Sequence, residues 1–122
     1  WQEYIDEWER EFGEVLQIKA NNRSPIKWWT KRDTQMSQAL DRLKTALKLS
    51  TTSLADDPNL RRHLLNAREW PRRGGTVIGK ETKNSPRKID LAMAATLAFE
   101  ARAHYLAENV GEEDSWIPIR IA

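Results

Sequence analysis

Residues 85–107, SPRKIDLAMAATLAFEARAHYLA, make up the longest helix-forming stretch of this sequence. Ser85-Pro86 begins it with a capping residue and a proline, a typical start of a helix. No glycine or proline follows before the end of the stretch, and seven alanines are interspersed with large apolar residues. A helix face of methyl groups lets a neighbouring element approach closely. We therefore expect a long, buried helix that runs to about Ala107, with another element packed close against it.

Apolar residues at helical spacing also predict an amphipathic helix at the N-terminus, ending near Gly13. The side chains that define it are Trp1, Ile5, Trp8 and Phe12. We expect this aromatic stripe to lie in the core. Residues 15–20 favour β-structure and place alternate apolar residues on one face, so they predict a short strand, followed by a loop over residues 21–25.

The middle of the chain predicts two more helices and short strands. A helix over residues 33–49 is indicated by a stripe of apolar residues, namely Met36, Leu40, Leu43 and Leu47. Asp57-Pro58 supplies an N-cap and a first-turn proline for the next helix, which we expect to end at Trp70-Pro71. Residues 50–54 suit a short strand or a connector. Residues 76–79 have the β-branched content of a strand or of one arm of a hairpin.

The composition restricts the kinds of site that the chain can hold. Its 122 residues are enough for one domain and too few for a second. Without cysteine and with two histidines, it excludes a disulfide framework and a thiolate zinc site, so a metal ion would need carboxylate ligands. No apolar run approaches the roughly 20 residues of a membrane span. The chain opens at Trp1 without a targeting segment, and we expect it to be part of a longer protein.

Charge is sorted along the chain. Residues 1–14 carry a net charge of −5, whereas residues 61–88 hold nine lysines and arginines against two glutamates, a net charge of +7. Basic side chains displace counterions from a nucleic-acid backbone, and Gly74-Gly75 would let the main chain approach it closely. The same stretch also suits a solvated basic loop. Residues 100–122 are acidic again, at −3.

Asp90 stands out because it is an acid in the first turns of the most apolar helix. An aspartate at a helix N-terminus complements the helix dipole, which accounts for it without any function. Alternatively, its carboxylate could bind magnesium, since hard cations prefer carboxylate oxygens. Asp57 already has a capping role, and Asp56 suits a loop position.

Other common reaction chemistries find no support in the sequence. No glycine-rich loop with a trailing lysine and hydroxyl is present, so we expect no ATP site in this chain. No serine lies in a nucleophile-elbow pattern. His63 and His104 each lie on a predicted apolar helix, where packing or capping is the expected role.

The stretch GTVIGKETKNSPRKIDLAMAATLAFEARAHYLA, residues 75–107, resembles the C-terminal end of the nuclease domain in large terminase subunits of tailed phages. The resemblance is greatest to actinobacterial phages and prophages, and Lys88-Ile89-Asp90 is its most specific part. It extends upstream in order and spacing to two further groups, namely Thr34-Gln35-Met36 with Ala39-Leu40, and Asp57-Pro58 with Leu60, His63, Asn66 and Ala67.

This resemblance implies an α/β fold: the helix-rich C-terminal portion of a ribonuclease H-like nuclease, with short strands of a mixed sheet. Residues 1–110 would be a partial nuclease domain and residues 111–122 a C-terminal tail. In that family acids around Mg²⁺ or Mn²⁺ cleave duplex DNA. The last of these acids matches Asp90, as a catalytic metal ligand, while the others would precede Trp1. Many relatives also carry a histidine and an aspartate where this chain has Leu54-Ala55.

Seven side chains of the basic stretch would then contact double-stranded DNA. They are Arg68, Arg72, Arg73, Lys80, Lys83, Arg87 and Lys88. The implied function of the intact protein is endonucleolytic cutting of concatemeric DNA during genome packaging, in the cytoplasm of the bacterial host. Its partners would be the remainder of the large subunit and the portal or the small subunit, with no membrane. We expect the isolated chain to be inactive, because one carboxylate places a metal poorly.

Two alternatives remain open at this point. The chain could be a non-catalytic DNA-binding or packaging-assembly module, such as a prophage remnant. A transposase or resolvase of the same fold is a weaker option.

Overall fold

The computed structural model describes residues 2–108. Within them it contains four helices and one two-stranded antiparallel sheet, consistent with the predicted α/β class. In chain order the elements are α1 (Gln2–Phe12), α2 (Asp33–Lys48), α3 (Pro58–Asn66), β1 (Arg68–Arg72), β2 (Gly75–Gly79) and α4 (Asp90–Glu108). The predicted domain boundary at residue 110 and the tail lie outside the described residues.

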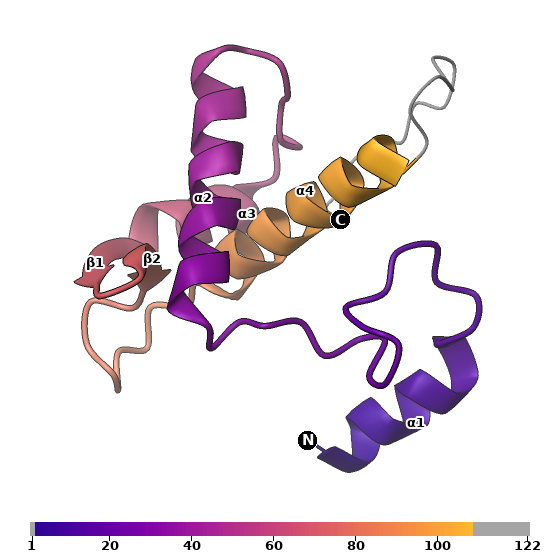
Figure 1. Ribbon diagram of the computed structural model, residues 1–122. Helices are drawn as coiled ribbons and strands as arrows, with labels where there is room; N and C mark the ends of the chain where they lie inside the picture. The colour runs from indigo at the N-terminus through magenta and orange to yellow at the C-terminus, as the bar shows by residue number, and fades with distance from the viewer. Residues whose placement is uncertain (1, 109–122) are drawn as a thin grey trace.

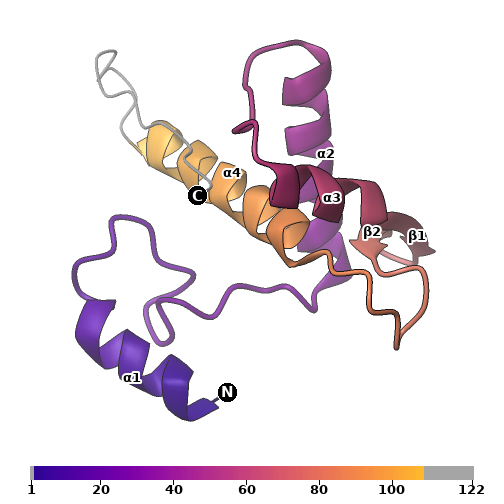
Figure 2. The same cartoon turned by 180° about the vertical axis from the view of Figure 1, so that it is seen from behind.

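The core forms where α4 crosses α2 and α3 (Figures 1 and 2). Ala92 and Ala95 of α4 are fully buried there, and so is Ala39 of α2. Close packing of the alanine-rich helix is therefore confirmed, because methyl side chains let the axes approach. Larger side chains complete the core, namely Met36, Leu40, Leu43, Leu60, Ile89 and Phe99.

The helices α2 and α3 begin close to where the sequence predicts. The Asp57 carboxylate accepts a hydrogen bond of 2.9 Å from the Leu60 amide, and Pro58 occupies the first turn, so this predicted start is confirmed. The predicted stripe of α2 is buried except for Leu47, which is 39% exposed near the end of the helix. Residues 50–54 form a connector.

The expected end of α3 at Trp70-Pro71 is wrong, because those residues belong to a strand. The helix stops at Asn66, and Ala67 has extended backbone angles while its amide still bonds to the carbonyl of His63. β1 then pairs with β2 in a hairpin that reverses at Arg73-Gly74, with Gly75 as the first residue of β2. Gly75 has a φ of +132°, a conformation that glycine adopts readily and other residues rarely do. The prediction of β2 is confirmed.

The expected start of the long helix at Ser85-Pro86 is also wrong, since α4 begins at Asp90. The Ser85 hydroxyl is used within the preceding loop instead. It donates to Glu81 at 3.1 Å and accepts from the Arg87 amide at 3.2 Å. The side chain that caps a helix in the prediction therefore closes a turn of the loop.

The predicted burial of the N-terminal aromatic stripe is wrong for Trp8 and Phe12, while Trp1 lies outside the described residues. α1 lies to one side of the other helices in both views and contains no buried residue (Figures 1 and 2). Trp8 is 44% exposed and Phe12 is 46% exposed. Leu16 and Ile26 of the following loop line the same shallow groove as these rings. The strand predicted over residues 15–20 is absent from the described residues, because no second strand lies there to pair with it.

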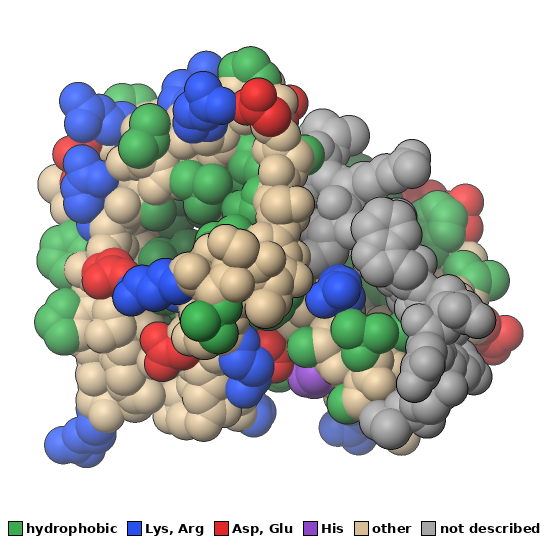
Figure 3. Space-filling model, turned by 90° about the horizontal axis from the view of Figure 1, so that it is seen from above, with side chains coloured by type: hydrophobic (Ala, Val, Ile, Leu, Met, Phe, Trp, Pro, Cys, Tyr) green, Lys and Arg blue, Asp and Glu red, His purple; other side chains and the backbone are tan. Residues whose placement is uncertain are grey.

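The face at the C-terminal end of α2 carries charges of both signs (Figure 3). Basic and acidic side chains surround hydrophobic side chains that are visible in a recess between them. None of the described helices combines the length and hydrophobicity of a membrane span.

Candidate functional site

In the hairpin, β2 packs against α2, and all five residues of β1 are exposed. Its register pairs Glu69 with Ile78, so these two side chains share a face. Glu69 forms an ion pair with Lys44 of α2, so β1 is also linked to the helix. At the turn, a side chain at Gly75 would collide with Ser37 of α2. The hairpin is therefore fixed on α2, and its orientation is set.

The opposite face shows Arg68, Trp70 and Arg72 in alternation. Val77 lies across from Trp70, and glycines lie across from the two arginines. All three β1 side chains are exposed, with Trp70 at 37%. The strand thus interleaves an aromatic ring with guanidinium groups on a surface open to solvent.

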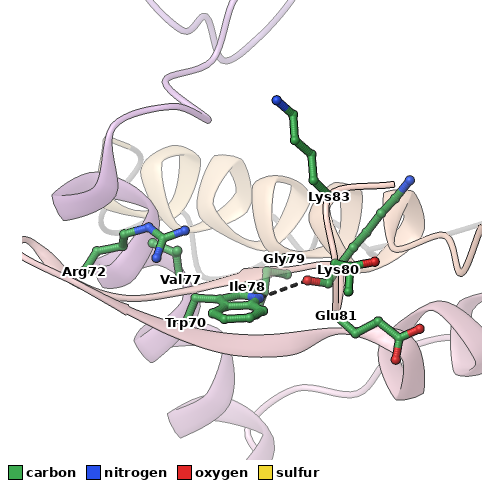
Figure 4. Close-up of a pocket in the computed structure, with 9 residues that line it drawn as sticks. Trp70, Arg72, Val77, Ile78, Gly79, Lys80, Glu81 and Lys83 are labelled. Atoms are coloured by element: carbon green, nitrogen blue, oxygen red, sulfur yellow. Dashed lines mark hydrogen bonds between the residues drawn. The ribbon is translucent and has the colours of Figure 1, made fainter. Parts of the chain in front are cut away.

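A groove of about 530 Å³ follows this face into the loop after β2. The Trp70 indole N–H donates a hydrogen bond of 3.0 Å to the carbonyl of Lys80. Figure 4 shows the ring lying along the strand beside Gly79, with Arg72 toward one end, and with Lys80 and Lys83 extending away from Glu81. The groove is therefore lined by one ring, by apolar residues of β2, and by basic side chains with Glu81 among them.

Most of the predicted DNA contacts are free to meet a ligand. Of the seven basic residues, Arg87 alone forms an ion pair within residues 2–108, with Glu81 at 3.5 Å. Arg68 donates to the carbonyls of Leu65 and Ala67, and Arg72 donates to that of Pro71, so these guanidinium groups keep their charge uncompensated. Glu69 is paired with Lys44, and Glu81 lines the groove beside Lys80 and Lys83, so the cations of the groove outnumber its one acid.

Asp90 lies exposed at the first residue of α4, and α3 holds this helix start in place. The Asn66 amide donates to the Lys88 carbonyl at 3.0 Å, and His63 Nδ1 accepts from the Leu91 N–H at 2.9 Å. His63 and Ile89 are both buried. The predicted capping role of His63 is thus confirmed, although it caps a different helix from its own. Asp90 is an exposed carboxylate on a fixed backbone.

The described residues do not assemble a metal site around Asp90. Residues 2–108 contain no group of three or more acids or histidines that could hold a metal ion. One carboxylate fits a magnesium ion only in part, since the ion is normally held by several oxygen ligands.

The sequence did not indicate the roles of two side chains, Trp70 and Glu100. The sequence places Trp70 at a helix end, although REWPRRGG over residues 68–75 is a pattern that also suits a hairpin. Glu100 is 1% exposed on the apolar helix and pairs with Arg42 of α2, with Arg42 Nε at 2.8 Å from Glu100 Oε2. His104 also contacts Glu100, and its ring lies 6.0 Å from that of Trp28, so it has a packing role, as predicted.

Comparison with known proteins connects the chain to bacteriophages. It is 33% identical over 120 residues to the "Gene 13 protein" of Mycobacterium phage L5, and equally to that of Mycobacterium phage D29. These relatives are phage proteins. The match covers 96% of this chain but 20% of each relative, so the chain spans about a fifth of their length. No family model and no solved structure matches the chain.

Proposed function

We propose that this chain is the C-terminal portion of a ribonuclease H-like nuclease domain in a phage large terminase. The observation that carries the proposal is the helix start at Asp90. His63 and Asn66 come from one segment that resembles the terminase family, and Lys88 to Asp90 come from another. The two segments, more than twenty residues apart in sequence, meet through hydrogen bonds. A resemblance in two separate segments gains weight when their residues are in contact.

The size of the relatives is compatible with a site that is completed from elsewhere in a longer protein. In the proposal, the other acids belong to a preceding segment, and Asp90 adds the last carboxylate. A bound Mg²⁺ or Mn²⁺ would supply activation of water and stabilisation of the leaving oxygen. The chain's own contribution is to hold the Asp90 carboxylate in a fixed position.

The basic hairpin provides the second half of the proposal, which is binding of double-stranded DNA. Arg68, Arg72, Arg73 and the lysines of the following loop would neutralise phosphates. These cations lie between the start of β1 and the start of α4, so one continuous segment carries both the DNA contacts and the metal ligand. Cutting of concatemeric DNA in the host cytoplasm, together with the portal or the small subunit, is the packaging reaction that this arrangement would serve.

The test is DNA cleavage by the intact parent protein with Mg²⁺. Asp90→Asn should reduce cleavage at least about a hundredfold, because it removes a metal ligand. DNA affinity should change less than about twofold, because phosphate contacts dominate it. Asp41→Asn is the matched control, since Asp41 is an exposed acid on α2 with no ion pair among the described residues. Cleavage by Asp90→Asn at the rate of the parent would refute the catalytic role.

The second candidate is a DNA-binding module without catalysis. It is favoured by the basic hairpin, which does not depend on Asp90, and by the single acid at the helix start. In that case, the intact protein would bind duplex DNA and release no cleavage product, with or without Asp90.

A further inference from the structure

We propose that the groove beside Trp70 binds an unpaired base of a DNA strand, stacked on the indole ring. This inference rests on the proposed DNA-binding role of the hairpin and adds a preference within it. A surface that contacts only phosphates needs basic side chains alone. Here an aromatic ring lies at the centre of the basic face, between Arg68 and Arg72.

The position of the ring favours stacking. On one side, Trp70 packs against β2 at Gly79, where a Cβ atom would come within 3.1 Å of the indole Cδ1. Glycine at this position therefore lets the ring lie along the strand. The hydrogen bond to the Lys80 carbonyl fixes the rotation of the ring. The ring is thereby held in one orientation and needs little reordering when a ligand binds.

The exposed part of the ring faces a groove that suits a nucleotide. Bases stack on aromatic side chains without sequence preference, and basic side chains follow the backbone of the same strand. Arg72 lies toward one end of the ring, with Lys80 and Lys83 toward the other (Figure 4). Within duplex DNA the faces of the bases are stacked on one another, so away from the duplex ends only an unpaired base can use this surface. The expected ligand is a single-stranded segment next to a duplex.

Fluorescence anisotropy of the 122-residue chain would test this with two DNA molecules, a blunt duplex and the same duplex with a single-stranded overhang. We expect the overhang to tighten binding about tenfold, the gain typical of one stacked base. Trp70→Leu should abolish this gain, and Trp70→Phe should retain most of it. Both variants lose the hydrogen bond to Lys80 and keep a large apolar side chain, so the aromatic face is the main difference between them.

Trp8→Leu serves as the control, because Trp8 is similarly exposed but lies on the acidic helix α1. It should leave the preference unchanged. Equal affinity for the two DNA molecules, or equal preference in Trp70→Leu and Trp70→Phe, would overturn the stacking site while leaving duplex binding intact. Failure to bind either DNA would overturn the proposed DNA interface as well.

Discussion

At the scale of single residues, His63 is the side chain on which the position of Asp90 depends most. Its Nδ1 accepts the Leu91 N–H, so His63→Ala removes the partner of this half-buried amide. We expect a loss of about 2 kcal/mol in the free energy of unfolding, measured by urea denaturation. The Leu91 amide should also exchange faster with solvent. Asn66→Ala, which removes a more exposed hydrogen bond, should lower the free energy of unfolding by less. Equal stabilities of His63→Ala and wild type would contradict the role of His63 in holding the start of α4.

Glu69 reports the docking of the hairpin on α2. The Lys44 ammonium lowers the pKa of the Glu69 carboxyl below its usual value, through a hydrogen bond and through charge attraction. Because the folded-state pKa is the lower one, the ion pair is complete at neutral pH and is lost as the pH falls through that pKa. In Lys44→Met, an NMR titration should show the pKa of Glu69 raised toward its ordinary value. Lys31→Met should leave the pKa unchanged, and no rise in Lys44→Met would contradict the contact.

At the scale of elements, the pair between Arg42 and Glu100 links α2 to α4. Hydrogen bonds to Glu100 raise the pKa of the Arg42 guanidinium, which therefore stays charged throughout the accessible pH range. Arg42→Met should lower the free energy of unfolding by about 3 kcal/mol, because it leaves a buried carboxylate with His104 alone. The double variant Arg42→Met with Glu100→Leu should recover much of this loss. Additive losses in thermal or urea unfolding would show that the two side chains are independent.

The elements that the sequence predicted well are those determined by local chemistry. The Asp57 cap and the apolar stripe of α2 locate the starts of two helices within a residue or two. The errors occur where contacts with a segment distant in sequence determine the local structure. β1 has the sequence REWPR, without the apolar alternation of a typical strand, and exists because β2 pairs with it and α2 supports the hairpin. The start of α4 moves from Ser85 to Asp90 because α3 supplies its cap.

At the scale of the whole molecule, the described residues form a compact group of three helices with a hairpin, and a separate N-terminal helix. The sequence could not reveal that α1 stays uncovered, because an amphipathic stripe shows that a face is apolar and not what covers it. It also could not reveal that Asn66 and His63 bond to the backbone of Lys88 and Leu91, on either side of Asp90. The sequence indicates these residues one by one, and the structure shows how they are arranged around the start of α4.

The central claim is that Asp90 is a metal ligand in a longer phage protein. Anomalous scattering from crystals of the intact parent soaked in Mn²⁺ would test it most directly. The account predicts a manganese peak at about 2 Å from the Asp90 carboxylate, the distance of a direct ligand. A manganese peak bound elsewhere in the protein, with the Asp90 carboxylate left in solvent, would contradict it.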